Sequence, residues 1–584
     1  MKIVLVPNPN GIRTKHVPLG LLSVGTALKR NGIEVEIVDL NSLPRDTSPE
    51  DLCSNILSRN PQCVGFSAMA SQFPRVLRIA GLVKNAGPDI KIILGGPEAT
   101  MKAEAVLPAF PEVDLIVRGE CEHTVVDVVK NLGNGPVLGS IPGITYRNGS
   151  RIVHNPDTPL ITDLDALESR DYGLLPSIES FGQTRAYPLP VEVGRGCPYG
   201  CVFCSLTSLL RRKFRVRSPE HIIAETKELQ SRYNAKYFNF LHDNMTVSRQ
   251  WILDLCDVIE RENMDIRWDG PSRADSLDAD LIKRLAETGC SGLYFGIETG
   301  SQRMQKVIRK NLKFDGLIDN IRRLTSSGIP FAASFIAGFP EETAEDLSDT
   351  IRLMMQLRFI SGVKMSDIQF GLLCPLMGSP LLETHGSHLR YDGEFAEMAS
   401  TDLSEEEERM IMSLPGLFPE FYYYPTNGTP RSTLVRLPFL LLNLLYLRHS
   451  IFMLFHDESL NFPLCVLRGV QPAHLGSEKR IVRHEGMSAI VKVSEFLSEL
   501  FKKNGLADHP IHDTLAYDVT LLKADSAGKG APTPLKIDFT YDVQSWVEAV
   551  RSGNFSTMER LPEKRANTVL FLKTGERVST MRVA

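Results

Sequence analysis

The chain has 584 residues, a formal net charge of −5, 43% hydrophobic residues and 23% charged residues. This length exceeds what a single hydrophobic core supports, so three or four domains are expected. The charge pattern shows no basic stripe, which disfavours a general nucleic-acid-binding protein, and ten cysteines in so long a chain exclude a disulfide scaffold.

Residues 1–135 alternate strand and helix patterns, which is typical of a parallel α/β sheet. Short apolar runs that end at polar or glycine residues indicate strands at 3–6, 34–38, 63–67, 91–94 and 114–117. Amphipathic segments indicate helices at 19–31, 49–58, 73–85, 101–109 and 124–132. The pattern predicts a Rossmann-like, doubly wound domain that binds its ligand at the carboxyl ends of the strands.

Residues 136–187 are interpreted as a linker, in which Asn148-Gly149 between apolar residues predicts a hairpin over 144–153. The alternation resumes over 188–385. It predicts strands at 190–193, 237–241, 265–269, 292–297, 331–336 and 367–372, and helices at 219–233, 249–262, 279–288, 314–327 and 344–357. Six such units predict a partial (β/α)6 barrel of the TIM type, with its site at the carboxyl ends of the strands.

Residues 386–584 are expected to form a mixed α+β region that shapes the substrate pocket. The pattern predicts a helix that ends at Ser413 and begins at Thr401 or Ser404, a helix at 543–552, and strands at 518–524, 535–541 and 568–572. The apolar stretch 434–455 has an uncharged run of 11 residues, Leu437–Leu447. Because a membrane span needs about 20 apolar residues, a buried helix is favoured over a membrane-surface helix.

Three cysteines, Cys197, Cys201 and Cys204, follow the first barrel strand within the segment GCPYGCVFC. Thiolates at spacings of four and three can bind three corners of an iron–sulfur cubane and leave the fourth iron open to substrate. Tetrahedral zinc would need a fourth ligand, and the next histidine, His221, comes 17 residues later at the start of a predicted helix. The motif therefore predicts a 4Fe–4S cluster.

This cysteine motif resembles that of the radical S-adenosylmethionine superfamily, and the resemblance extends over residues 190–375. The segment Ser334–Glu341 resembles the family's fifth-strand adenine motif, with Ser334 in place of the usual Gly, and Gly296–Ser301 resembles its fourth-strand motif. His242-Asp243-Asn244 is similar to the acidic turn of the cobalamin-binding branch. The resemblance implies S-adenosylmethionine contacts from Phe203, Asp243, Asn244, Glu298, Ser301, Ser334, Ile336 and Gly338.

The resemblance also implies the chemistry. The amino and carboxylate groups of S-adenosylmethionine would chelate the open iron, and one-electron reduction would release a 5′-deoxyadenosyl radical that abstracts hydrogen from an unreactive carbon. Arg217 and Arg309 are candidates for the methionyl carboxylate, although a structural or surface role is favoured for each. No catalytic side chain is assigned.

The N-terminal pattern resembles the cobalamin-binding domain of the same branch. Small and hydroxyl residues follow successive strands, where they let a backbone approach a large flat ligand. The implied cobalamin contacts are Pro18, Gly20, Ser67, Ser71, Gly95, Gly96, Pro97, Thr100, Gly119 and Glu120. The motif Asp-x-His-x-x-Gly is absent and the neighbours of His16 do not match it, so no histidine is expected as the lower ligand of cobalt. The alternative is a flavodoxin-like domain that only packs against the barrel.

These resemblances favour a cobalamin-dependent radical methyltransferase that acts on an unactivated carbon of a natural product or peptide. The alternatives are an enzyme with the same cofactors that catalyses a rearrangement, ring contraction or cyclisation, and a non-catalytic cobalamin sensor or scaffold. The expected partners are a small-molecule or peptide substrate and a reductant such as flavodoxin or ferredoxin, with no nucleic acid and no membrane span. Scattered single cysteines and a first apolar run too short for a secretion signal favour the cytoplasm.

Overall fold

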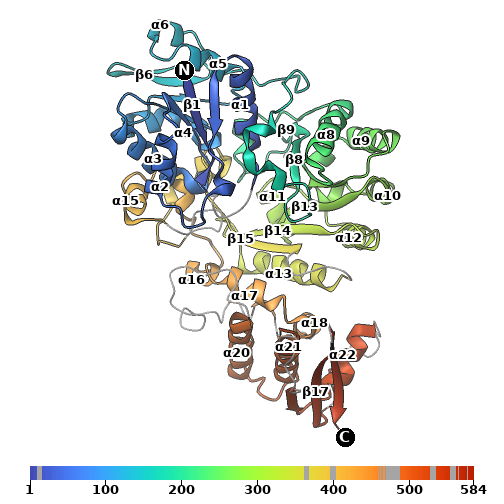
Figure 1. Cartoon of the computed structure of the whole chain (residues 1–584). Helices are drawn as coiled ribbons and strands as arrows, with labels where there is room; N and C mark the ends of the chain where they lie inside the picture. Colours follow the sequence, from blue (N-terminus) through green and yellow to red (C-terminus); the bar gives the residue numbers. More distant parts are fainter. Residues whose placement is uncertain are drawn as a thin grey trace.

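The structure is a computed structural model that describes residues 1–9, 16–360, 367–394, 403–457, 460, 462–464, 467, 487–526, 535–552, 561–562, 564–574 and 577–583. Thr401, one of the two predicted helix starts, and Cys465 lie outside these residues. Two sheets with flanking helices form the upper part of the molecule, and a smaller region follows at the C-terminal end (Figure 1).

The N-terminal sheet has seven strands in the order β2-β1-β3-β4-β5-β6-β7. Its strands are β1 (Lys2–Val6), β2 (Glu34–Ile37), β3 (Cys63–Ser67), β4 (Lys91–Gly95), β5 (Leu115–Val117), β6 (Ile144–Asn148) and β7 (Arg151–His154). The first five are parallel, whereas β6 and β7 are antiparallel. The predicted hairpin is therefore present, and it extends this sheet instead of lying apart in a linker.

Helices cover both faces of this sheet, which confirms the doubly wound prediction. They are α1 (Leu19–Arg30), α2 (Pro49–Leu57), α3 (Phe73–Ala86), α4 (Pro97–Ala109), α5 (Thr124–Lys130) and the short α6 (Gly135–Leu138). Side chains of alternate parity on each strand pack on α1 and α5 on one face and on α2, α3 and α4 on the other. Helix α4 begins at Pro97, four residues before the predicted start, because proline is favoured in the first turn of a helix.

The central sheet has six parallel strands in the order β15-β14-β13-β12-β11-β8. They are β8 (Leu189–Glu192), β11 (Tyr237–Leu241), β12 (Arg267–Ser272), β13 (Cys290–Glu298), β14 (Phe331–Ala337) and β15 (Ile368–Leu372). Strands β8 and β15 are the edges, so the barrel is open, as predicted. A two-stranded ribbon, β9 (Gly194–Arg195) with β10 (Arg215–Val216), follows β8.

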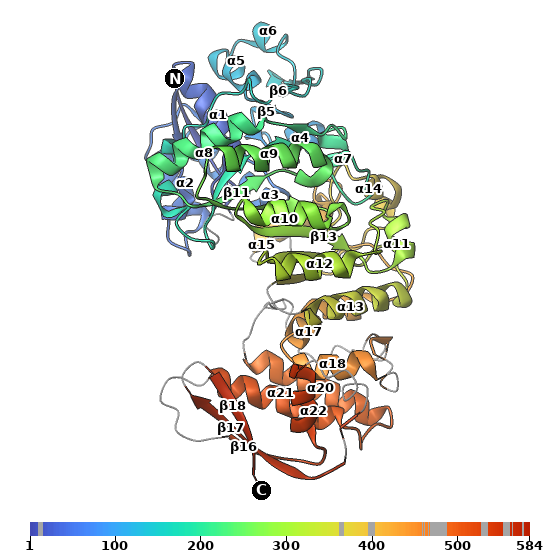
Figure 2. The ribbon, with the colours of Figure 1, turned by 90° about the vertical axis from the view of Figure 1, so that its right-hand side faces the viewer.

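One helix follows each of five barrel strands on the outer face. Figure 2 shows these helices stacked in chain order: α8 (Pro219–Tyr233), α9 (Arg249–Arg261), α10 (Ala279–Glu287), α12 (Leu317–Ser326) and α13 (Ala344–Phe359). The short helices α7 (Leu206–Leu209) and α11 (Gln302–Val307) lie within the loops at the carboxyl ends of the strands. The predicted helix at 314–327 begins at Leu317, after Gly316 in the left-handed conformation.

The C-terminal region is helical with a small antiparallel sheet, β16-β17-β18. Its elements are α14 (Pro380–His385), α15 (Glu405–Ser413), α16 (Arg431–Leu434), α17 (Leu437–Leu444), α18 (Arg448–His456), α20 (Met487–Lys503), α21 (Ile511–Ser526), β16 (Leu535–Phe539), α22 (Val543–Ser552), β17 (Asn567–Thr574) and β18 (Arg577–Val583). Ser404 caps α15 in a capping box with Glu407.

Two predictions for this region are wrong. The predicted strand at 518–524 is part of helix α21, because Asp518 accepts hydrogen bonds from Ser450 and His449 on α18 and fixes the segment against that helix. The single buried helix predicted at 434–455 is instead split among α16, α17 and α18, which begin near Pro430, Pro438 and Arg448. No helix in the described part of the chain is long and apolar enough to cross a bilayer.

Candidate active site

The cysteine loop follows β9 and runs from Gly196 to Cys204. All three cysteines are partly exposed and free. Gly196 has φ +88°, and an added Cβ would lie 1.9 Å from the carbonyl oxygen of Lys213, so glycine is required there. The Gly196 N–H donates to a carboxylate oxygen of Asp243 at 2.6 Å. The loop therefore takes its path from the turn after β11.

The donor set fits an iron–sulfur cluster better than a single zinc ion. Among the residues described, no three His, Cys, Asp or Glu side chains converge on a point where one ion could bind. His221, the nearest candidate for a zinc ligand, contacts Ser218 and Asp165 instead. Burial raises the pKa of Cys204 to about 11, so its thiolate is expected to form when it coordinates iron. Each corner of a cubane takes one thiolate, which suits three separated donors.

Two cations that the sequence patterns did not reveal lie beside the cysteine loop. Arg273 lies over the ring of Tyr199, 4.1 Å from its centroid, and donates both to Asp275 and to the carbonyl of Lys310. Lys310 donates to Glu298 at 2.8 Å. Burial opposes the charge on Lys310, but the carboxylate of Glu298 outweighs it and raises the pKa.

Glu298 ends β13 in a strained turn. Its φ is +68°, and the register with β14 shifts between Gly296 and Glu298. A Cβ at Gly296 would lie 2.3 Å from the Glu298 carboxylate and 2.9 Å from the Lys310 ammonium. The fourth-strand motif therefore needs glycine at position 296, because any larger side chain would displace the Glu298–Lys310 ion pair.

The fifth-strand motif lines the same opening. Ser334 and Ile336 alternate with buried Phe335 and so face away from the outer helices. Gly338 has φ +99° and donates its N–H to Glu342 at 2.7 Å. The ring of Phe203 meets that of Phe339 edge-on, with centroids 5.8 Å apart. Phe203, from the cysteine loop, thus lies against the segment that follows β14.

Several predicted residues have protein partners. Ser301 is buried, donates to Asp346 and caps α11, so its hydroxyl is already used. Asp243 accepts from Gly196, and Asn244 is buried and accepts from Thr246. Arg217 is buried in an ion pair with Glu225, which is a structural role. Arg309 is exposed.

A cavity of about 610 Å³ lies at the carboxyl ends of β1, β3, β4 and β5. It is lined by every predicted cobalamin residue except Ser71: Pro18, Gly20, Ser67, Gly95, Gly96, Pro97, Thr100, Gly119 and Glu120. Gly96 has φ +93°, and a Cβ there would lie 2.9 Å from the carbonyl oxygen of Ala68. At Gly20 and Gly119 a Cβ would meet nothing within 4 Å, so these positions leave room for a bulky ligand.

The barrel supplies the opposite wall of this cavity. Leu209 and Leu210, which follow the cysteine loop, and Glu192 and Arg195, which precede it, also line the cavity. Sequence patterns missed these four residues because they belong to the barrel region and lie far along the chain from the cobalamin motifs. A corrinoid in this cavity would therefore lie directly beside the cysteine loop.

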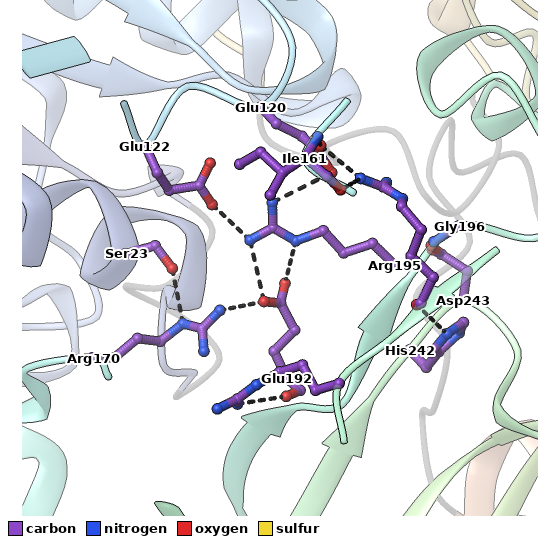
Figure 3. Close-up of polar contacts among 12 residues, drawn as sticks. Ser23, Glu120, Glu122, Ile161, Arg170, Glu192, Arg195, Gly196, His242 and Asp243 are labelled. Carbon is purple, nitrogen blue, oxygen red and sulfur yellow. Dashed lines mark hydrogen bonds and ion pairs between the residues drawn. The ribbon is translucent and has the colours of Figure 1, made fainter. Parts of the chain in front are cut away.

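Buried ion pairs join the two walls (Figure 3). Arg195 contacts Glu192, Glu122 and Glu120, while Arg170 pairs with Glu192 and donates to Ser23 of α1. Burial by itself would raise the pKa of Glu192, but the guanidiniums of Arg170 and Arg195 outweigh it and lower the pKa to about 2. The carboxylate of Glu192 is therefore charged at neutral pH.

Comparisons with known proteins agree with this geometry. A family model described as Radical SAM superfamily matches residues 191–354, and one described as B12 binding domain matches residues 11–129. An uncharacterized methyltransferase of Pyrococcus horikoshii is 31% identical over 392 residues, which cover 66% of this chain and 83% of the relative. An anaerobic magnesium-protoporphyrin IX monomethyl ester cyclase of Synechocystis is 28% identical over 343 residues, which cover 58% of this chain and 68% of the relative.

The fold is shared with a solved structure. The cobalamin-dependent S-adenosylmethionine radical enzyme OxsB, with aqua-cobalamin and S-adenosylmethionine bound, superposes with a TM-score of 0.61 at 16% identity, covering 90% of this chain and 84% of that one. The matched cysteine loop, the motif-lined cavity and the two family models point to one conclusion. The chain belongs to the cobalamin-binding radical S-adenosylmethionine enzymes, and its cofactors are a 4Fe–4S cluster, S-adenosylmethionine and cobalamin.

Proposed function

We propose that this chain is a cobalamin-dependent radical S-adenosylmethionine methyltransferase that methylates an unactivated carbon of a small natural product or peptide. The observation that carries the proposal is the shared wall: the cavity that the cobalamin motifs line is closed by residues on either side of the cysteine loop. When bound, the cluster and S-adenosylmethionine supply a radical and cobalamin supplies a methyl group. The relative named as a methyltransferase supports the same activity.

The residues of this chain bind and orient these groups. Cys197, Cys201 and Cys204 would hold the cluster, and Glu298 lies in the motif to which the resemblance assigns a contact with the nucleoside. Lys310, which pairs with Glu298, is proposed to bind the methionyl carboxylate. Ser334, Ile336 and Phe203 would flank the adenine. The corrin would lie over Gly20, Gly96 and Gly119, where small residues permit close approach.

The substrate is proposed to enter the open face of the barrel. Tyr294 on β13 is 41% exposed and Leu241 on β11 is 37% exposed, although both strands lie inside the sheet. Their neighbours Phe295 and Phe240 are buried against the outer helices, so Tyr294 and Leu241 face the lumen. Asp269 accepts from Asn239 on this same face. The lumen thus offers both apolar and hydrogen-bonding groups to an organic substrate.

The test is anaerobic reconstitution with iron, sulfide, hydroxocobalamin, S-adenosylmethionine and a low-potential reductant, followed by mass spectrometry of candidate substrates. Methylation predicts a gain of one CH₂ per turnover together with 5′-deoxyadenosine. The cyclase relative supports a second candidate, a cyclisation, which predicts a hydrogen-depleted product without added carbon. A non-catalytic sensor predicts no 5′-deoxyadenosine, and that result would refute both enzymatic proposals.

A reductant such as flavodoxin or ferredoxin and a cytoplasmic location are part of this proposal. The cluster needs one electron per turnover from a low-potential donor. Each cysteine that the structure describes is free, which suits a reducing compartment. Purification from a cytosolic fraction, followed by reduction with flavodoxin in place of dithionite, tests both points.

A further inference from the structure

A single arginine joins the two cofactor regions. Arg195 ends β9 and directly precedes the cysteine loop. Its guanidinium lies 2.8 Å from Glu192, 2.6 Å from Glu122 and 3.3 Å from Glu120 (Figure 3). Glu120 and Glu122 belong to the loop after β5 of the N-terminal sheet, and all four side chains line the cobalamin cavity.

The network around this arginine is buried and consists of groups of opposite charge. The four side chains are only 7–17% exposed. Arg170 also pairs with Glu192 and with Glu225, and Arg215 also pairs with Glu120 at 2.7 Å. The carboxylates of Glu120, Glu122 and Glu192 are thus shared among the guanidiniums of Arg195, Arg170 and Arg215. Among the described residues, Arg195 contacts Glu120, Glu122 and Glu192, whereas Arg170 and Arg215 each pair with one of these three carboxylates. Without it, two guanidiniums would remain for three buried carboxylates, and their mutual repulsion would push the two loops apart.

The same arginine is tied to the path of the cysteine loop. Arg195 pairs with Arg215 in the β9–β10 ribbon, and Gly196 donates to Asp243. Cys197 follows two residues after Arg195. The side chain of Arg195 therefore reaches the corrinoid domain while its backbone fixes where the first cluster ligand lies.

We infer that Arg195 is a positioning residue that fixes the Glu120–Glu122 loop relative to the cysteine loop and thereby couples cobalamin binding to S-adenosylmethionine binding. Arg195 does not touch the reacting atoms. Coupling of this kind is reciprocal, so S-adenosylmethionine changes the affinity for cobalamin by the same factor by which cobalamin changes the affinity for S-adenosylmethionine. The inference requires only that both cofactors bind, and it holds whichever reaction the enzyme catalyses.

The test compares Arg195→Gln and Arg195→Lys with the wild-type holoenzyme, reconstituted anaerobically. The matched control is Arg284→Gln, because Arg284 also contacts three carboxylates, those of Asp257, Glu260 and Glu287, but on the outer surface of the barrel. Hydroxocobalamin is titrated with and without S-adenosylmethionine, and iron content and 5′-deoxyadenosine formation are measured in parallel. The EPR signal of cob(II)alamin is recorded with the cluster oxidised and reduced, because its broadening reports the separation of the two centres.

The wild type and Arg284→Gln should show a change in hydroxocobalamin Kd on addition of S-adenosylmethionine, about 5-fold or more. Arg195→Gln should keep its iron but lose the effect of S-adenosylmethionine on the hydroxocobalamin Kd. It should also lose the broadening of the cob(II)alamin EPR signal by the reduced cluster. Arg195→Lys should lose part of both, since one ammonium cannot bind three carboxylates in a fixed fork. Should Arg195→Gln fail to load iron, the hydroxocobalamin Kd and the EPR signal of Arg195→Lys decide between the outcomes. Wild-type coupling and broadening in the variants, or no coupling in the wild type itself, would overturn the inference.

Discussion

Replacement of Lys310 by methionine tests the part of the site that the sequence patterns did not reveal. Lys310 lies just after α11, and its ammonium is 2.8 Å from Glu298, with side chains that are 12% and 9% exposed. Methionine keeps the unbranched aliphatic part of the side chain, is one atom shorter and removes the charge. Two effects are expected, one on the stability of the free protein and one on the binding of S-adenosylmethionine.

The magnitudes follow from burial and charge. Breaking a buried ion pair by removing one partner costs about 3–5 kcal/mol of stability, because the carboxylate of Glu298 stays buried without a partner. A charged hydrogen bond contributes about 1.5–3 kcal/mol, so loss of a contact to the methionyl carboxylate should weaken S-adenosylmethionine binding about 10–150-fold. The double variant Glu298→Gln, Lys310→Met should recover stability but not affinity.

The assays are urea unfolding of the free protein and equilibrium binding of S-adenosylmethionine to anaerobically reconstituted enzyme of matched iron content. Lys306→Met is the control, since Lys306 is an exposed lysine on α11, one turn earlier. If Lys310→Met binds S-adenosylmethionine within twofold of the wild type, Lys310 does not face the cosubstrate. The assignment of Glu298 to the nucleoside would then rest on the resemblance of the fourth-strand motif alone.

Three further outcomes are expected. Lys102→Met should lower the free energy of unfolding by about 3–5 kcal/mol, because Lys102 is fully buried between Glu98 and Glu420, and a loss below about 1 kcal/mol in urea unfolding would contradict this. Burial raises the pKa of Glu342 to about 8, so the contribution of this side chain to stability is complete below about pH 4.5 and is lost as the pH rises through about 8. Glu342→Gln should flatten the dependence of Tm on pH over this range, and an unchanged dependence would contradict the prediction. Gly20→Leu should fold normally but weaken hydroxocobalamin binding at least about 10-fold relative to Gly20→Ala, since its side chain enters the cavity, and equal affinities would exclude Gly20 from the cofactor contact.

Local patterns predicted most of the two sheets. Strand β11 and helices α8 and α22 have the predicted bounds, because their apolar residues recur with the period of the element and their ends carry turn or capping residues. The segment 518–524 of helix α21 is predicted as a strand, since Val519 and Thr520 favour strands, and the contact of Asp518 with α18 outweighs that preference.

The cofactor motifs were also visible in the sequence, because a cluster loop and glycine-rich turns are built from residues that lie close together along the chain. The predicted cobalamin residues, apart from Ser71, line one cavity. What the patterns could not show was the surrounding ion pairs. Lys310 and Arg273 lie 37 residues apart and meet through a backbone carbonyl.

The sequence by itself determined the class of the molecule: three thiolates in one loop and the periodicity of two α/β sheets are local properties of the chain, and they specify the cluster and its scaffold. Only the tertiary structure decided how the two cofactor regions meet. Arg195 and Glu122 are 73 residues apart and carry no shared motif, yet they lie 2.6 Å apart. The packing of the two regions brings these side chains together. Because a buried charge needs a partner of opposite sign, each of them depends on that packing for its partner.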